Sequence, residues 1–134
     1  MLEGTTSLAS RHVLVIEDDE AIARFVASAI VDLGLSVAVA RTGHQGLEMA
    51  AQRPPNLVVL DLGLPGLYGT TLGITLRASQ PGLPIIVMSA LPRHAVAADA
   101  WMIGAHTYLT KPFDVDALET AVRSALAMTG FTAS

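Results

Sequence analysis

The stretch VLVIEDDE, residues 13–20, carries four apolar residues that run directly into four carboxylates. The apolar half is typical of a strand buried on both faces, because helices cover each side of a parallel sheet. The acidic half places negative charge at the point where that strand ends. The stretch therefore predicts a buried strand that delivers acidic groups to one edge of a sheet.

Four further apolar runs have a similar character, and with the first they are the expected strands. Their ranges are 12–16, 36–40, 56–60, 84–88 and 105–109. Segments of helical period separate the runs, at residues 22–33, 43–53, 69–79, 92–103 and from 115 onward, after Asp114 as N-cap. Gly34 and Gly104 predict the ends of the first and fourth helices. The segment 69–79 has the poorest helix propensity, because it contains three threonines and two glycines, so tertiary packing would have to hold it.

Strand and helix thus alternate five times. With right-handed crossovers, this order predicts an α/β protein in which an open parallel sheet lies between two layers of helices, a three-layer doubly wound (βα)5 fold. In such folds ligands bind beyond the carboxyl ends of the strands.

Composition limits the classes of function. The 134 residues suit one domain, expected at 11–128 with loose tails at 1–10 and 129–134. The net charge is −4 and the basic residues are scattered, which argues against direct nucleic-acid binding. There is no cysteine, no apolar run long enough for a membrane span and no secretory signal pattern, so we expect a cytoplasmic protein without membrane contact.

Four of the five expected strands are followed by polar groups at the same edge. These groups are Glu17, Asp18, Asp19, Asp61, Ser89 and Lys111. Clustered carboxylates need a compensating cation, and oxygen ligands suit Mg²⁺. Lys111 is the only lysine, since the other seven basic residues are arginines, and a compact ammonium fits a small anion in a tight site. The edge therefore predicts a magnesium site.

Simpler explanations exist for each residue alone. Asp18 or Asp19 could cap the first helix, and acidic residues favour a helix N-terminus in any case. Asp61 could belong to the turn before Pro65, and Ser89 is ordinary at a junction between strand and helix. The combination on one edge favours the site over these alternatives.

The segments IEDDE, DLGLPG, MSA and YLTKPF, in this order and spacing, resemble the receiver domain of two-component response regulators over residues 11–128. The resemblance implies a flavodoxin-like sheet of order 2-1-3-4-5. It also implies a module that accepts a phosphoryl group from a histidine kinase, a phosphotransfer protein or a small phosphodonor, with Mg²⁺ as cofactor, and that is not a turnover enzyme.

By this resemblance Asp61 is the phospho-acceptor. Asp18 would bind Mg²⁺ directly, Glu17 through water and Gly63 through its backbone carbonyl. Ser89 and Lys111 would bind phosphoryl oxygens, and a cis peptide would precede Pro112. Ser89 and Tyr108 would form the switch, which biases the face of the fourth helix, fifth strand and fifth helix toward an output domain, a downstream protein or a homodimer. Tyr108 could instead be an ordinary half-buried strand aromatic.

Departures from the family pattern concern details. Ser89 stands where threonine is commoner, and His106 and Thr107 replace a more usual acidic or small pair. Gly63 and Leu91 have no polar side chain to orient an attacking water, which predicts a slowly decaying phosphoaspartate. On the apolar fourth helix, helical period predicts that the core face carries Val96, Ala100 and Ile103. Trp101 and Met102 would then point partly away from the core and suggest a partner or dimer surface, although Trp101 could simply cover the sheet edge.

Two other functions could use a similar set of residues. A haloacid dehalogenase type phosphatase also uses an aspartate nucleophile after a strand, but it needs a second aspartate where this chain has Gly63. A receiver-like binding module that is never phosphorylated would be expected to lack the acceptor, an acid or the lysine, and all are present. The kinase, the target and whether the domain stands alone or belongs to a longer regulator stay open.

Overall fold

The computed structural model describes residues 11–64 and 69–127. Strands and helices alternate along the chain. Their bounds are β1 (His12–Ile16), α1 (Glu20–Asp32), β2 (Ser36–Ala40), α2 (Gly43–Gln52), β3 (Leu57–Asp61), α3 (Gly69–Ser79), β4 (Ile85–Ser89), α4 (Arg93–Ile103), β5 (Thr107–Thr110) and α5 (Val115–Ala127). All strand pairs are parallel and the order is β2-β1-β3-β4-β5, which confirms the expected fold class. The tails expected at 1–10 and 129–134 lie outside the described residues.

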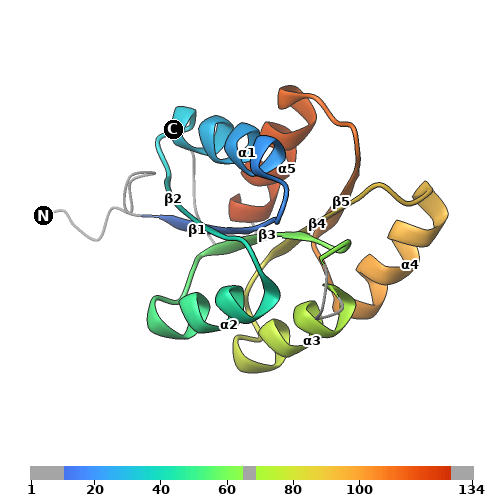
Figure 1. Ribbon diagram of the computed structural model, residues 1–134, viewed down its shortest axis with the longest axis horizontal. Helices are drawn as coiled ribbons and strands as arrows, with labels where there is room; N and C mark the ends of the chain where they lie inside the picture. Colours follow the sequence, from blue (N-terminus) through green and yellow to red (C-terminus); the bar gives the residue numbers. More distant parts are fainter. Residues whose placement is uncertain (1–10, 65–68, 128–134) are drawn as a thin grey trace, which may run out of the picture.

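The helices form two layers around the sheet. Helices α1 and α5 cover one face, and α2, α3 and α4 cover the other (Figure 1). Each face has its own apolar core, one built around Val15, Val26 and Leu118 and the other around Leu60, Leu76 and Val96. The three central strands β1, β3 and β4 are buried at every position, as their continuous apolar sequence predicts.

Several predicted boundaries were wrong by one or two residues. Strands β3 and β4 begin one residue later than predicted, so Asp61 and Ser89 are the last residues of their strands rather than the first residues after them. Strand β5 begins at Thr107 rather than Ala105, because the Ala105 N–H donates to Ala100 O and closes the end of α4. Gly34 and Gly104 follow α1 and α4 with φ of 86° and 76°, the left-handed conformation that favours glycine.

Helix α3 forms at 69–79 as predicted, and tertiary packing accounts for it. Leu72 and Leu76 are buried in the core. A side-chain carbon at Gly73 would lie 2.8 Å from atoms of Ile103 in α4, so the glycine permits close packing of the two helices. Packing thus offsets the poor helix propensity of this segment.

Helix α4 shows the predicted division between core and surface. Val96, Ala100 and Ile103 are buried, while Trp101 is 84% exposed and Met102 59% exposed. With so much of its surface in solvent, Trp101 does not cover the sheet edge, and that alternative is wrong. None of the helices within the described ranges has the length and apolar character of a membrane span.

Candidate functional site

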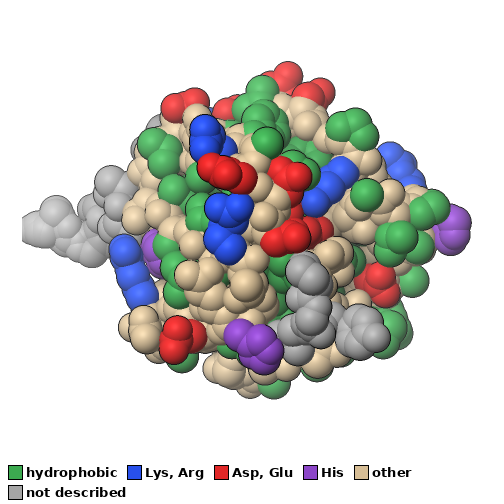
Figure 2. Space-filling view, viewed as in Figure 1, with side chains coloured by type: hydrophobic (Ala, Val, Ile, Leu, Met, Phe, Trp, Pro, Cys, Tyr) green, Lys and Arg blue, Asp and Glu red, His purple; other side chains and the backbone are tan. Residues whose placement is uncertain are grey.

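The parallel register brings the carboxyl ends of the strands together. Ile16 pairs with Leu60 and with Ala40, Asp61 with Met88, and Ser89 with Thr110. The residues that follow β1 and β5 therefore reach the same edge as Asp61 and Ser89. Figure 2 shows acidic and basic side chains gathered near the middle of the molecular face turned toward the viewer.

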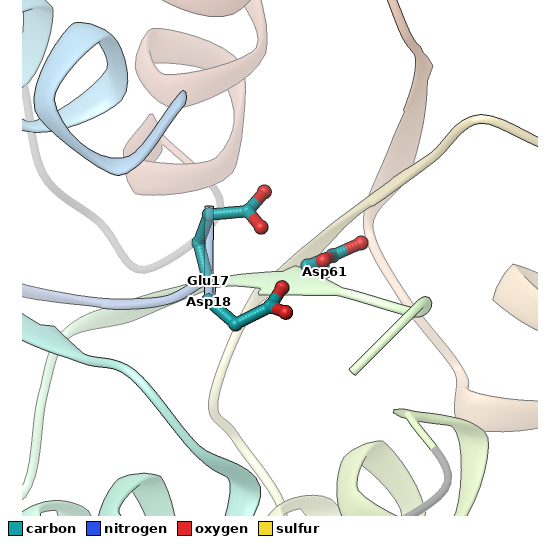
Figure 3. Close-up of side chains that lie close together, drawn as sticks. All are labelled: Glu17, Asp18 and Asp61. Carbon is teal, nitrogen blue, oxygen red and sulfur yellow. The ribbon is translucent and has the colours of Figure 1, made fainter. Parts of the chain in front are cut away.

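Three carboxylates meet at this edge. One carboxylate oxygen from each of Glu17, Asp18 and Asp61 lies within 4.8 Å of the other two (Figure 3). Glu17 and Asp61 are buried, with 0% and 4% of their surfaces exposed, whereas Asp18 is exposed to solvent. Two buried acids and one open acid form a pocket of oxygen ligands with access from solvent, which suits a hard divalent cation.

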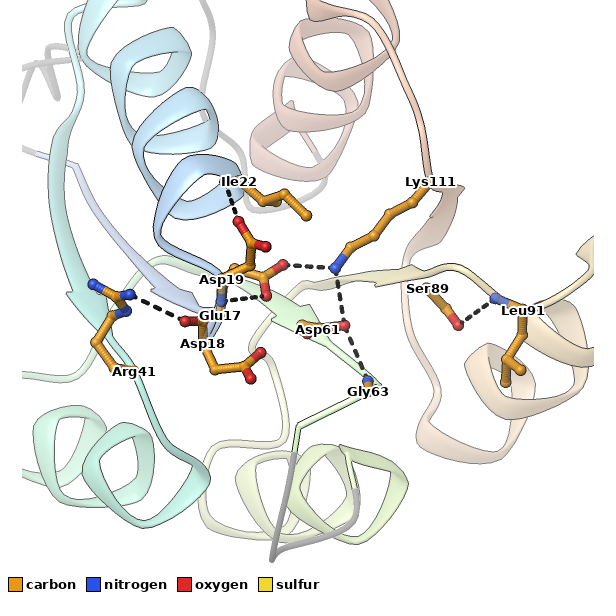
Figure 4. A network of polar contacts seen from close by, with 10 residues as sticks. All are labelled: Glu17, Asp18, Asp19, Ile22, Arg41, Asp61, Gly63, Ser89, Leu91 and Lys111. Carbon is orange, nitrogen blue, oxygen red and sulfur yellow. Dashed lines mark hydrogen bonds and ion pairs between the residues drawn. The ribbon is translucent and has the colours of Figure 1, made fainter.

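Lys111 places a single ammonium among these acids. Its Nζ lies 2.8 Å from Glu17 Oε1 and 3.3 Å from Asp61 Oδ1, across 94 residues of sequence in the first case (Figure 4). One cation thus serves two buried carboxylates, and a third carboxylate lies beside them. The donor set is short of positive charge, and this deficit is the observation that fits Mg²⁺.

The pKa shifts reflect the same deficit. Burial raises the pKa of Glu17 to about 7, the Lys111 hydrogen bond lowers it, and the neighbouring Asp61 raises it. Burial lowers the pKa of Lys111, but its contacts with Glu17 and Asp61 outweigh burial and leave that pKa above the ordinary value. Lys111 is therefore charged at neutral pH, and the pKa of Glu17, about 7, lies close to neutral pH.

Gly63 lies directly beside the Asp61 carboxylate. Its N–H donates a 3.0 Å hydrogen bond to Asp61 Oδ1, the same oxygen that Lys111 approaches. A side-chain carbon at position 63 would lie 3.5 Å from that oxygen. A polar side chain at this position would therefore reach a group bound to Asp61, and glycine leaves the approach open.

Asp19 has a different role from its acidic neighbours. Its side chain accepts a 2.9 Å hydrogen bond from the Ile22 N–H and caps α1. The capping explanation is thus correct for Asp19, whereas Glu17 and Asp18 join the acid cluster. The run of four acids therefore divides three ways, because Glu17 and Asp18 join the cluster, Asp19 caps α1 and Glu20 pairs with Arg24 on α1.

The remaining predicted residues lie along β4 and β5. The Ser89 hydroxyl is buried and accepts a 3.0 Å hydrogen bond from Leu91 N–H. Tyr108 is half-buried against the core on the α2, α3 and α4 face, and the Lys111–Pro112 peptide bond is cis. No described contact joins Ser89 or Tyr108 to Asp61, so their switching roles stay predictions.

Arg41 was not singled out from the sequence, although it lies at the same edge. It follows β2, and its Nη2 donates a 3.0 Å hydrogen bond to the backbone carbonyl of Asp18 (Figure 4). The available signal was its position, since β2 was the one strand without a polar group assigned to its carboxyl end. With Arg41, all five strands contribute to this edge.

Comparison with known proteins agrees with this geometry. The model of the response regulator receiver domain family matches residues 13–123. The chain is 40% identical over 115 residues to the KDP operon transcriptional regulatory protein KdpE of Escherichia coli K12, covering 86% of this chain and 51% of that protein. It is 37% identical over 122 residues to the uncharacterized transcriptional regulatory protein YkoG of Bacillus subtilis 168, covering 89% and 52%. The chain therefore spans about half the length of these relatives.

One solved structure has the same fold as this chain over nearly the whole length of both proteins. The receiver domain protein (CheY-like) from Methanospirillum hungatei JF-1 superposes with a TM-score of 0.84 and covers 90% of this chain and 96% of that one. The identity is 24%, so this likeness concerns the fold. It agrees with the sheet order and with the two helical layers.

Proposed function

This chain belongs to the response regulator receiver family, and on that premise we propose that it accepts a phosphoryl group on Asp61 in a Mg²⁺-dependent reaction. The observation that carries the proposal is the cluster of Glu17, Asp18 and Asp61, two of which, Glu17 and Asp61, contact the Lys111 ammonium. Buried acids with too little positive charge favour the binding of a cation. A phosphoryl group on Asp61 could then contact both that cation and Lys111. The haloacid dehalogenase alternative is set aside by the family match.

Each residue has a task in the proposed transfer. A carboxylate oxygen of Asp61 attacks phosphorus while the bond from phosphorus to the donor atom breaks. The bonding electrons leave with the donor, an imidazole nitrogen of a histidine kinase or phosphotransfer protein, or an acyl oxygen of a small phosphodonor. The product is an acyl phosphate on Asp61. Gly63 N–H and Lys111 orient the attacking carboxylate, since both contact its Oδ1.

Charge neutralisation is the second requirement of phosphoryl transfer. Asp18 would hold Mg²⁺ directly, Glu17 through water, and Asp61 and the Gly63 carbonyl would complete the protein ligands. When bound, Mg²⁺ supplies positive charge to the phosphoryl oxygens. Lys111 would move from its carboxylate partners to those oxygens, and Ser89 would donate its hydroxyl to them.

The output follows from the new charge at Asp61. The Ser89 hydroxyl would give up its hydrogen bond with Leu91 N–H and move toward the phosphoryl group. Tyr108 would then turn inward into the space that Ser89 vacates. These movements would shift the conformational equilibrium of the face formed by α4, β5 and α5. KdpE and YkoG are named as transcriptional regulatory proteins and are longer than this chain. We therefore expect this face to act on an output domain, a downstream protein or a second copy.

The deciding experiment is intact mass spectrometry after incubation with acetyl phosphate and Mg²⁺. We expect one phosphoryl adduct on the wild type and none on Asp61→Asn or in the presence of EDTA. A wild type that takes up no phosphoryl group and binds no Mg²⁺ would instead support a receiver-like binding module that works without phosphorylation. An adduct on Asp61→Asn would refute the choice of acceptor.

A further inference from the structure

The loop between β1 and α1 depends on a contact from the β2 edge. Glu17 N–H donates to Ala40 O at 3.0 Å, which extends the pairing of β1 with β2 one step beyond the strand. Arg41, the next residue, then reaches the Asp18 carbonyl with its guanidinium at 3.0 Å. The loop that carries Asp18 is thus hydrogen-bonded to the carboxyl end of β2 at two points.

One peptide group is held from both sides. The peptide that joins Asp18 to Asp19 accepts the Arg41 hydrogen bond at its C=O, and its N–H donates to Glu17 Oε2 at 3.1 Å (Figure 4). Holding this peptide restricts the backbone at Asp18, from which its carboxylate side chain departs. With both polar groups engaged, the peptide plane has one favoured orientation.

Arg41 is itself well anchored. Its backbone N–H donates to Gln45 Oε1 at 2.6 Å, and the Gln45 N–H donates to the Thr42 hydroxyl that caps α2 at 3.0 Å. The start of α2 therefore fixes the base of the Arg41 side chain. The arginine that contacts Asp18 is therefore held by the N-terminus of α2 and is not a freely moving surface side chain.

Asp18 needs such a constraint more than its partners do. Glu17 and Asp61 are buried and fixed by Lys111, whereas Asp18 is exposed and lies within 4.8 Å of both negative groups. Repulsion would drive a free Asp18 carboxylate toward solvent in the absence of a cation. We propose that Arg41 is a positioning residue that holds the Asp18 peptide so that its carboxylate faces the cation site, an inference that rests on the proposed Mg²⁺-binding role of Asp18.

Charge and positioning predict opposite effects of removing Arg41. A nearby guanidinium repels a cation, so on Coulomb grounds alone its removal would tighten Mg²⁺ binding. Loss of positioning would weaken binding, because partners that orient a metal ligand contribute to its affinity. The sign of the change therefore separates the two explanations.

The test is an NMR titration of the full chain with MgCl₂, comparing the wild type with Arg41→Met, which keeps the aliphatic stem. We expect the dissociation constant for Mg²⁺ to rise about tenfold, at the low end of the effect of such partners. Arg41→Lys, which keeps one donor, should lie between the two. Arg24→Met is the matched control, because Arg24 is an exposed arginine nearby whose partner is Glu20, 2.6 Å away.

A second readout needs no metal. In Mg²⁺-free protein, the Asp19 amide should exchange with solvent faster in Arg41→Met than in the wild type, while the Ile22 amide at the helix cap should be unchanged. Equal or tighter Mg²⁺ binding by Arg41→Met, or an unchanged Asp19 amide, would overturn the positioning role alone. A wild type that binds no Mg²⁺ would overturn the proposed function together with this inference.

Discussion

The polar residues at the amino edge of the sheet and those at its carboxyl edge differ in how they are paired. At the amino edge, His12 N–H donates to Asn56 Oδ1 and Asn56 N–H donates to His12 O, both at 2.8 Å. At the carboxyl edge, Glu17, Asp18 and Asp61 form a cluster in which one ammonium, that of Lys111, contacts Glu17 and Asp61. At the first edge this pair satisfies its polar groups within the chain, whereas the acids at the second edge have a deficit of positive charge that a ligand could fill. Stability and function are therefore separated along the strands.

The largest expected effect removes the ammonium that contacts the buried acids at the carboxyl edge. Lys111→Met should slow phosphorylation by acetyl phosphate at least about 100-fold, because one fixed charge that meets the phosphoryl oxygens is lost. The rate is measured as adduct formation by intact mass. Arg24→Met should react at the wild-type rate. If Lys111→Met also reacts at that rate, the carboxyl edge does not use its ammonium for chemistry.

The second prediction breaks the amino edge. Asn56→Ala removes the acceptor for His12 N–H, and the free energy of unfolding should fall by about 1–3 kcal/mol, the cost of an unsatisfied donor. Urea unfolding measures the loss. Asn56→Asp keeps an acceptor and should retain most of the stability. Phosphorylation of Asn56→Ala should be unchanged, and a slowed reaction would show that the two edges are not separate.

A third prediction sharpens the account of the carboxyl edge. The phosphoaspartate should decay slowly, since neither Gly63 nor Leu91 can orient water. Gly63→Asn should shorten its half-life about tenfold, less than the full effect of a positioned acid–base group, because the new side chain begins beside Asp61 Oδ1. Intact mass followed over time after removal of the phosphodonor measures both. A wild-type half-life of only seconds would contradict the prediction.

The smallest effects are pH dependences of opposite sign at the two edges. The raised pKa of Glu17 makes the folded, metal-free protein bind a proton more tightly than the unfolded chain does. Glu17 should therefore lower the free energy of unfolding as pH rises from 4.5 to about 7. Burial and the charge of Arg53 lower the pKa of His12, so His12 should lower that free energy as pH falls below 6.5.

Urea unfolding in EDTA across this range separates the two contributions. Glu17→Gln should remove the loss of stability that occurs as pH rises from 4.5 to about 7, and His12→Gln should remove the loss that occurs as pH falls below 6.5. Each substitution should leave the other dependence in place. A Glu17→Gln profile that matches the wild type would show that Glu17 does not titrate near neutrality.

Much of the fold was predictable because its signals are local. Continuous apolar runs marked the buried strands, and Gly34 and Gly104 marked helix ends that need a positive φ. The position of helix α3 was predictable from the sequence, but the reason for the glycine at position 73 was not. That reason is the close packing of Gly73 against Ile103, a contact between residues far apart in the sequence. The boundaries of β3, β4 and β5 depended on hydrogen bonds between elements, which local patterns do not contain.

The sequence by itself determined the alternation of strands and helices, the family and the acids, hydroxyl and lysine that reach one edge, because residue type and spacing carry that information. Only the tertiary structure decided that Asp19 caps α1 while Asp18 lies with Glu17 and Asp61, since residue type alone does not distinguish Asp18 from Asp19 and the family resemblance gave the role of Asp18 only as an expectation. It alone also joined Lys111 to Glu17 and Arg41 to Asp18. These contacts depend on parallel register, which brings together groups that the chain keeps far apart.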